Sequence, residues 1–191
     1  MLELLAHWFA AVCGQDPGHT WAPGGILLPC CQRCTGLYAG AGAAALLHLW
    51  LRPKLSGRFL EIHGAFLVVM VPFGFHWVAQ GPLLRTLTGV LFGFGVVTFL
   101  WLPLSQEVGL RLSRPVGVQD SAWGYFAVLG ATLILLPTTA MLGGAFAAYG
   151  LSGGAFWGAL VLVALIAGDV CLGLVGALRL LRRLTRPRLE P

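Results

Sequence analysis

The sequence AFWGALVLVALIAGDVCLGLVGAL occupies residues 155–178 and contains a single charged residue, Asp169. An α-helix needs about 20 predominantly apolar residues to cross the hydrocarbon core of a bilayer. Inside lipid every backbone polar group needs a partner within the protein, and a helix supplies these partners within one segment. The stretch therefore predicts a membrane-spanning helix.

The composition of the whole chain supports the same conclusion. The 191 residues are 58% hydrophobic and only 10% charged, with a mean hydropathy of +0.84, whereas a soluble domain is about one quarter charged. These values exclude an ordinary soluble globule, a coiled coil and a disordered chain. Further apolar stretches predict spans over residues 35–51, 59–79, 83–104 and 122–147. We expect an all-α polytopic membrane helix bundle of about five transmembrane helices, forming a single membrane domain over residues 1–191.

Residues 1–12 are too short to cross a bilayer, because twelve helical residues extend only about 18 Å. Leu5, Trp8, Phe9 and Val12 fall on one helical stripe. This pattern predicts a short interfacial helix lying on the outer leaflet.

The basic residues predict the orientation. With five spans, ten of the 12 Lys and Arg residues lie on one side, and cytoplasmic loops carry the excess of such residues. We therefore expect the N-terminus outside, residues 179–191 as a basic cytoplasmic tail, and a location in the cell inner (plasma) membrane. Because the charges flank apolar segments, we expect lipid and not nucleic acid as the partner. The ten are Arg52, Lys54, Arg58, Arg111, Arg114, Arg179, Arg182, Arg183, Arg186 and Arg188.

Glycines are spaced four residues apart within, or directly beside, three of the expected spans. Small residues at this spacing let two helix backbones approach closely in a membrane. The pattern therefore predicts close helix–helix contacts at three pairs, which are Gly36 with Gly40, Gly89 with Gly93, and Gly154 with Gly158.

Four of the five cysteines precede the first expected span, at Cys13, Cys30, Cys31 and Cys34. At a helix start, Cys31 and Cys34 share one face, and the partial positive charge of the helix N-terminus favours their thiolates. Cys171 lies within the last span, where a small packing residue is expected.

Three interpretations of this outward-facing cluster remain open. The first is a zinc-like metal site made by Cys13, Cys31 and Cys34, completed by His19 or His76. The second is thiol redox chemistry between Cys31 and Cys34. The third is a structural disulfide that pins the N-terminal segment to the first span.

Several polar residues lie in or near the expected spans. Arg33 and Arg85 either lower the pKa of nearby thiols or reach the lipid phosphates. Asp169 lies deep in a span and suggests a small transporter. A last group, interpreted as solvated interfacial residues, is His48, Glu61 and His63.

The cysteine stretch resembles a known family. The motif residues are Cys13, Gln15 and Pro17, then Leu28, Pro29, Cys31, Arg33, Cys34, Thr35, Gly36 and Tyr38, and finally Arg85, Thr88 and Gly89. Over residues 13–104 they are similar to the prokaryotic membrane-protein family called domain of unknown function 2085. The resemblance implies a membrane protein but no particular reaction. Where the family has a histidine after the first cysteine, Gly14 stands in this chain, so His19 or His76 would have to replace it as a ligand.

The sequence thus favours a membrane protein with an outward Cys/His cluster that binds zinc or performs thiol redox chemistry, without assigning a catalytic residue. Two other classes stay open. One is a non-catalytic subunit of a larger membrane complex, in which a disulfide staples the N-terminal segment. The other is a transporter that uses Asp169. Whether the protein is an enzyme is not decided by these residues.

Overall fold

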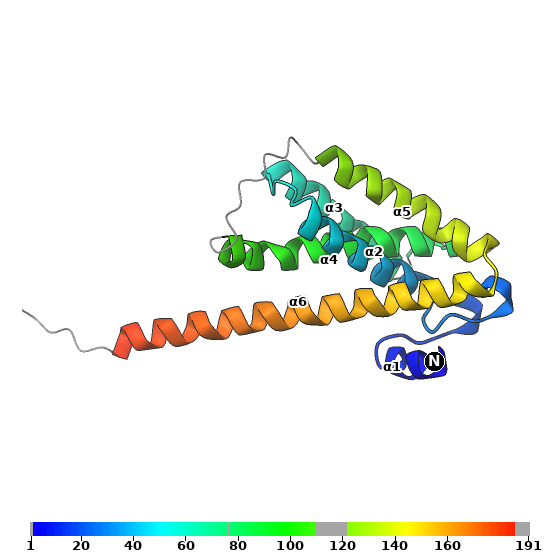
Figure 1. Cartoon of the computed structure of the whole chain (residues 1–191), viewed down its shortest axis with the longest axis horizontal. Coiled ribbons are helices and arrows are strands. Elements are labelled where there is room, and N and C mark those ends of the chain that lie inside the picture. Colours follow the sequence, from blue (N-terminus) through cyan, green and yellow to red (C-terminus); the bar gives the residue numbers. More distant parts are fainter. Residues whose placement is uncertain (1, 76, 110–121, 186–191) are drawn as a thin grey trace, which may run out of the picture.

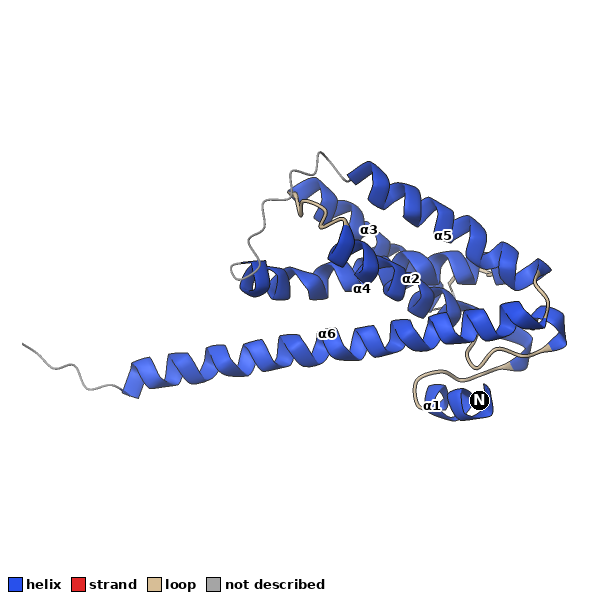
Figure 2. Ribbon diagram, viewed as in Figure 1, coloured by secondary structure: helices blue, strands red, loops and turns tan. Residues whose placement is uncertain are grey.

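The computed structural model is an all-helical bundle (Figure 1). It describes residues 2–75, 77–109 and 122–185, and it describes side chains as far as residue 105 in the second range and residue 181 in the third. Over these ranges no strand is formed, as Figure 2 shows, and the predicted all-α membrane fold is confirmed. The helices are α1 (Leu2–Ala10), α2 (Gln32–Trp50), α3 (Gly57–Gly74), α4 (Pro82–Gly109), α5 (Ala122–Leu142) and α6 (Ala145–Thr185), with short 3-10 turns η1 (Pro17–His19) and η2 (Pro23–Gly25).

Four of the described helices, α3, α4, α5 and α6, are long and apolar enough to cross a membrane. The expected first span, residues 35–51, lies on α2, which has 19 residues but is rich in alanine and glycine. Polar residues near its ends, which are Gln32, Arg33 and His48, lower the hydropathy of α2. The small residues suit its central position, where it packs against α4, α5 and α6.

Several helix ends differ from the expected spans. Helix α3 ends at Gly74, before the expected end at residue 79, and α4 continues to Gly109, beyond the expected end at residue 104. The expected span 122–147 is wrong in running through Gly143 and Gly144, where α5 has ended and before α6 begins. Glycine has the second-lowest helix propensity, after proline, so two in succession favour this break. Helix α6 is longer than residues 155–178 at both ends and has 41 residues, because the Leu- and Arg-rich sequence after residue 178 continues to favour a helix.

The most extensive helix contact in the bundle joins α2 to α4 through the glycines that the sequence pattern selected. A Cβ atom added to any of four glycines would overlap a backbone atom of the facing helix, so the two backbones touch. This confirms the two glycine pairs on α2 and α4. The overlaps are Gly36 with Thr86, Gly40 with Val90, Gly89 with Arg33, and Gly93 with Leu37.

Helix α6 is held against α2 by one glycine of the third predicted pair. A Cβ atom at Gly158 would overlap the carbonyl group of Tyr38, whereas one at Gly154 would meet nothing within 4 Å. The prediction of close packing is therefore confirmed for Gly158 and wrong for Gly154.

The helices alternate in direction along the bundle (Figure 1). Helices α2, α4 and α6 run one way, while α3 and α5 run the other. The link between α2 and α3, with Arg52 and Lys54, therefore lies at one end of the bundle. Helix α1 and the start of α2 lie at the opposite end.

We predict that Gly93→Ala destabilises the protein by about 1–3 kcal/mol, the usual cost of overpacking a tight contact. The added methyl group would overlap the carbonyl of Leu37. Thermal unfolding in detergent measures the effect. Gly154→Ala is the matched control, because its methyl group meets open space, and it should change stability by less than about 0.5 kcal/mol. Equal stability of the two variants would show that the α2–α4 contact is not tight.

Candidate metal centre

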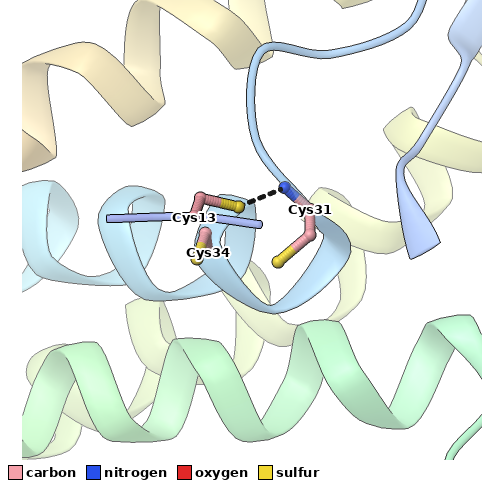
Figure 3. A group of neighbouring side chains, drawn as sticks. All are labelled: Cys13, Cys31 and Cys34. Carbon is pink, nitrogen blue, oxygen red and sulfur yellow. Dashed lines mark hydrogen bonds between the residues drawn. The ribbon is translucent and has the colours of Figure 1, made fainter. Parts of the chain in front are cut away.

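Three cysteines from two separate stretches meet at the end of the bundle that carries α1. Cys13 lies three residues after α1, Cys31 is the N-cap residue of α2, and Cys34 lies in the first turn of that helix. Their Sγ atoms all lie within 4.8 Å of one another, and each cysteine is a free thiol. Figure 3 shows the three side chains gathered at the helix start. This spacing is close enough for the three sulfurs to hold one metal ion.

The position of Cys13 depends on contacts with the start of α2 and on Gln15. The Cys31 backbone N–H donates to Cys13 Sγ at 3.2 Å. Gln15 adopts a positive φ of 48°, and its side-chain amide donates to the carbonyls of Ala6 and Pro29, the latter at 2.8 Å. Gln15 therefore joins α1 to the segment that precedes α2, and it keeps the two cysteine stretches together.

The loop between the two cysteine stretches is itself anchored to the bundle. Thr20 and Cys31 form an isolated antiparallel bridge, and the Leu28 N–H donates to the Trp21 carbonyl at 2.9 Å. The Trp21 indole N–H donates to Thr86 Oγ1 on α4, also at 2.9 Å. These contacts fix the chain on both sides of the thiols.

The surroundings of the thiols are apolar and shared by three helices. The ring of Phe9 on α1 lies 5.1 Å from the ring of Tyr38 on α2. Together α1, α2 and α6 shelter the cluster, and Cys13 is 6% exposed. The buried neighbours are Leu5, Phe9, Cys30 and Ala155, with Tyr38 and Ala159 partly buried beside them.

Hydrogen bonds and burial act differently on two of the thiols. Hydrogen bonds from the thiols of Cys31 and Cys34 lower the pKa of Cys13, and these outweigh the opposing effect of its burial. Burial raises the pKa of Cys30 to about 12, and its Sγ atom lies 3.4 Å from Thr35 Oγ1. A thiolate is thus favoured at Cys13, the form that binds a metal ion, and disfavoured at Cys30.

The histidines expected as fourth ligands are not among the grouped donor atoms. His19 Nδ1 lies 3.0 Å from Asp16 Oδ2, and both side chains are largely exposed. Within the described residues, the metal-binding group contains the three cysteines alone. His76 lies outside the described residues, so its role as a ligand stays a prediction.

The two arginines near the cluster differ in their partners. One guanidinium N–H group of Arg33 reaches the carbonyl of Phe73 at 2.8 Å and Gln80 Oε1 at 2.6 Å. Arg33 therefore fastens the carboxyl end of α3, where a cation is favoured. The Nε atoms of both Arg33 and Arg85 are buried without a hydrogen-bond partner.

The interpretation of His48 and His63 as solvated interfacial residues is wrong. His48 is 1% exposed and His63 is 0% exposed, while Glu61 is exposed. Hydrogen-bond contacts with Thr98 and Tyr125 make this burial tolerable, since the ring nitrogens find partners inside the bundle. The spacing of the histidines in the sequence could not predict these partners, because Thr98 and Tyr125 lie on other helices.

Asp169 is half-buried on α6. Its Oδ1 atom is shielded from solvent and has no hydrogen-bond partner. Its use in transport stays a prediction.

Comparison with known proteins agrees with the motif analysis. Residues 13–99 match the sequence model of the family described as "Predicted membrane protein (DUF2085)". This segment is similar to the DUF2085 family. It contains the whole cysteine cluster, α2, α3 and most of α4, while α5 and α6 lie outside it. No curated protein and no solved structure matches the chain.

We predict that Cys30 resists alkylation in the folded protein. With a pKa of about 12, about one in ten thousand Cys30 side chains is a thiolate at pH 8, and the thiolate is the reactive form. Labelling of the metal-free protein with iodoacetamide, read by peptide mass spectrometry, should find Cys30 at least 100-fold slower than Cys31, with a rate that rises toward pH 12. The control is the detergent-denatured chain, in which both label equally. Equal rates in the folded protein would contradict the burial of Cys30.

Proposed function

We propose that this protein is a multi-pass membrane protein that binds one thiophilic metal ion, with zinc as the leading candidate, at Cys13, Cys31 and Cys34. The observation that carries the proposal is the convergence of three sulfurs from two stretches within 4.8 Å. A disulfide would need only two of these three thiols. Because the third sulfur lies within the same 4.8 Å of the other two, a metal ion bound by all three explains the arrangement better than a disulfide between two of them.

The distances agree with this chemistry. Zinc binds thiolate sulfur at about 2.3 Å in a tetrahedron, which places two bound sulfurs about 3.8 Å apart. The sulfurs already lie within 4.8 Å, so small side-chain rotations suffice to bind an ion. The low pKa of Cys13 supplies the first thiolate, and metal binding displaces the remaining thiol protons.

The fourth ligand is left to His19, His76 or a small molecule. His19 would have to leave Asp16, to which it is now bound. A position open to water is typical of catalytic zinc sites, whereas a fourth protein ligand is typical of structural ones. The identity of this ligand therefore decides between a reactive and a structural centre.

We further propose that α2 crosses the membrane in addition to α3, α4, α5 and α6, which gives five spans, and that the cysteine cluster faces outward. The alternating helix directions in Figure 1 support this, because they collect Arg52 and Lys54 at the end away from the cluster. Basic residues favour the cytoplasmic side. Under this topology the cluster lies at the extracytoplasmic surface of the plasma membrane.

The metal proposal predicts about one zinc ion per chain in protein purified without chelators, measured by elemental mass spectrometry. Replacing any one of Cys13, Cys31 or Cys34 with serine should weaken zinc binding by at least tenfold, because one of the ligands is lost. Cys171→Ser is the control and should bind normally, since Cys171 lies on α6 away from the cluster.

Two further variants and one mass measurement complete this test. His19→Gln and His76→Gln identify the fourth ligand by which of them weakens binding. Metal-free protein with two of the cluster cysteines oxidised, 2 Da lighter than the reduced chain, would replace the proposal with the disulfide staple. Reduced protein that binds no zinc or other soft ion would also reject it.

The topology proposal predicts opposite labelling at the two ends of the bundle. A cysteine introduced by Gly14→Cys should react with a membrane-impermeant maleimide in intact cells, because Gly14 is exposed beside the cluster. One introduced by Ser56→Cys, in the link between α2 and α3, should react only after permeabilisation. The parent chain gives the background from native thiols. The reverse pattern would invert the proposed orientation.

A further inference from the structure

A second polar cluster lies near the opposite end of the bundle, and it is made of four completely buried side chains from four helices. They are His48 on α2, His63 on α3, Thr98 on α4 and Tyr125 on α5, each at most 1% exposed. The proposed metal centre uses none of them. They form one connected chain of hydrogen-bond contacts, and the contacts can be followed atom by atom.

The chain of contacts begins at a carbonyl group. His63 Nδ1 lies 2.8 Å from the Phe59 carbonyl, and His63 Nε2 lies 3.1 Å from the Tyr125 hydroxyl. That hydroxyl lies 3.4 Å from Thr98 Oγ1. Thr98 Oγ1 in turn contacts the Phe94 carbonyl at 2.9 Å and His48 Nε2 at 3.0 Å.

Counting protons in this chain shows that one is missing in the neutral state. Five contacts need five hydrogens, but the two neutral imidazoles, the phenol and the threonine hydroxyl supply only one hydrogen each. Because a carbonyl only accepts, His63 must donate from Nδ1 to Phe59, and its bare Nε2 takes the Tyr125 hydrogen. In every neutral arrangement at least one contact is therefore left without a hydrogen.

One additional proton on His63 Nε2 completes all five contacts. His63 then donates to both the Phe59 carbonyl and the Tyr125 oxygen, and Tyr125 donates to Thr98. The Thr98 hydroxyl donates to Phe94, and His48 donates to Thr98. A proton placed on His48 does not have this effect, because His48 already supplies the hydrogen of its contact from Nε2.

Aromatic rings surround His63, and the stacked face of Phe59 favours a cation there. The ring of Phe59 stacks on the imidazole with centroids 4.2 Å apart, and Phe66 lies edge-on at 5.1 Å. Tyr125 and Phe126 follow at 5.4 and 6.1 Å. A cation that lies over an aromatic face within about 6 Å is stabilised, and the effect is stronger when the pair is shielded from water.

We propose that His63 is a proton-binding site inside the bundle, at which one proton from water converts the neutral imidazole to an imidazolium held by Phe59, Tyr125 and the aromatic rings. The titratable groups that face it are His48 from α2 and Tyr125 from α5, while α4 contributes the neutral Thr98. Among the described residues, no carboxylate contacts it, and Glu61 on its own helix is exposed. Burial opposes the charge, so proton uptake depends on these neighbours.

Nitrogen-15 NMR of histidine-labelled full-length protein in lipid nanodiscs tests the proposal between pH 9 and pH 5. His63→Gln assigns the His63 signals. We expect His63 to change from one protonated ring nitrogen to two as the pH falls, while His48 keeps one. Tyr125→Phe removes the acceptor for the new N–H and should lower the proton affinity of His63 about tenfold or more, since a hydrogen bond to a charged group is among the stronger ones.

The matched control is Tyr149→Phe, because Tyr149 is an exposed residue on α6, and it should leave the titration unchanged. His63 that keeps a single N–H down to pH 5 overturns the proposal. Proton uptake at His48 in its place also overturns it. The proposal is also overturned if His63 takes up a proton only at pH values at which circular dichroism shows that the helices have unfolded. If the Tyr125→Phe protein folds and its His63 titrates as in the parent protein, the hydrogen-bond contacts of Tyr125 do not support proton binding, and the proposal is overturned.

Discussion

The close contact between the backbones of α2 and α4 is the constraint on which the rest of the structure depends. Since lipid is as apolar as leucine, membrane helices gain little from burying apolar surface, and close packing has to hold them together. The glycines at 36, 40, 89 and 93 remove the side chains that would keep these helices apart. The contact fixes α2 in the centre, and α6 then approaches α2 at Gly158. The start of α2, with Cys31 as its N-cap and Cys34 in its first turn, is positioned by this contact.

The two polar clusters follow from the same arrangement. At one end, the segment that carries Cys13 folds back on the start of α2 and is held there by Gln15. At the other end, the four central helices bring Thr98 and Tyr125 against two histidines. In the first cluster the reactive atoms are soft sulfurs, suited to a metal ion. In the second they are hydroxyls and imidazoles, suited to a proton. The two clusters therefore lie near opposite ends of α2, with Cys34 close to its start and His48 close to its end.

The sequence predicted what depends on local pattern and missed what depends on contacts between distant segments. Helix class, the α2–α4 glycine faces and the meeting of Cys13 with Cys31 and Cys34 were predicted, because hydropathy and spacing encode them. The break at Gly143 was missed, since the apolar pattern continues across it. The burial of His63 was missed because its partner Tyr125 is 62 residues away. Gln15 appeared only as a motif residue, and its bridging bonds require the folded loop.

The fold-back of Cys13 onto α2 has a consequence for biosynthesis. A chain made from its N-terminus presents Cys13 first, but the other two sulfurs take their positions only when α2 has formed, and α2 is held by α4. The three-sulfur arrangement is therefore a late product of assembly. An ion that needs all three sulfurs is acquired after the membrane helices have docked, and its presence would distinguish finished molecules from nascent ones.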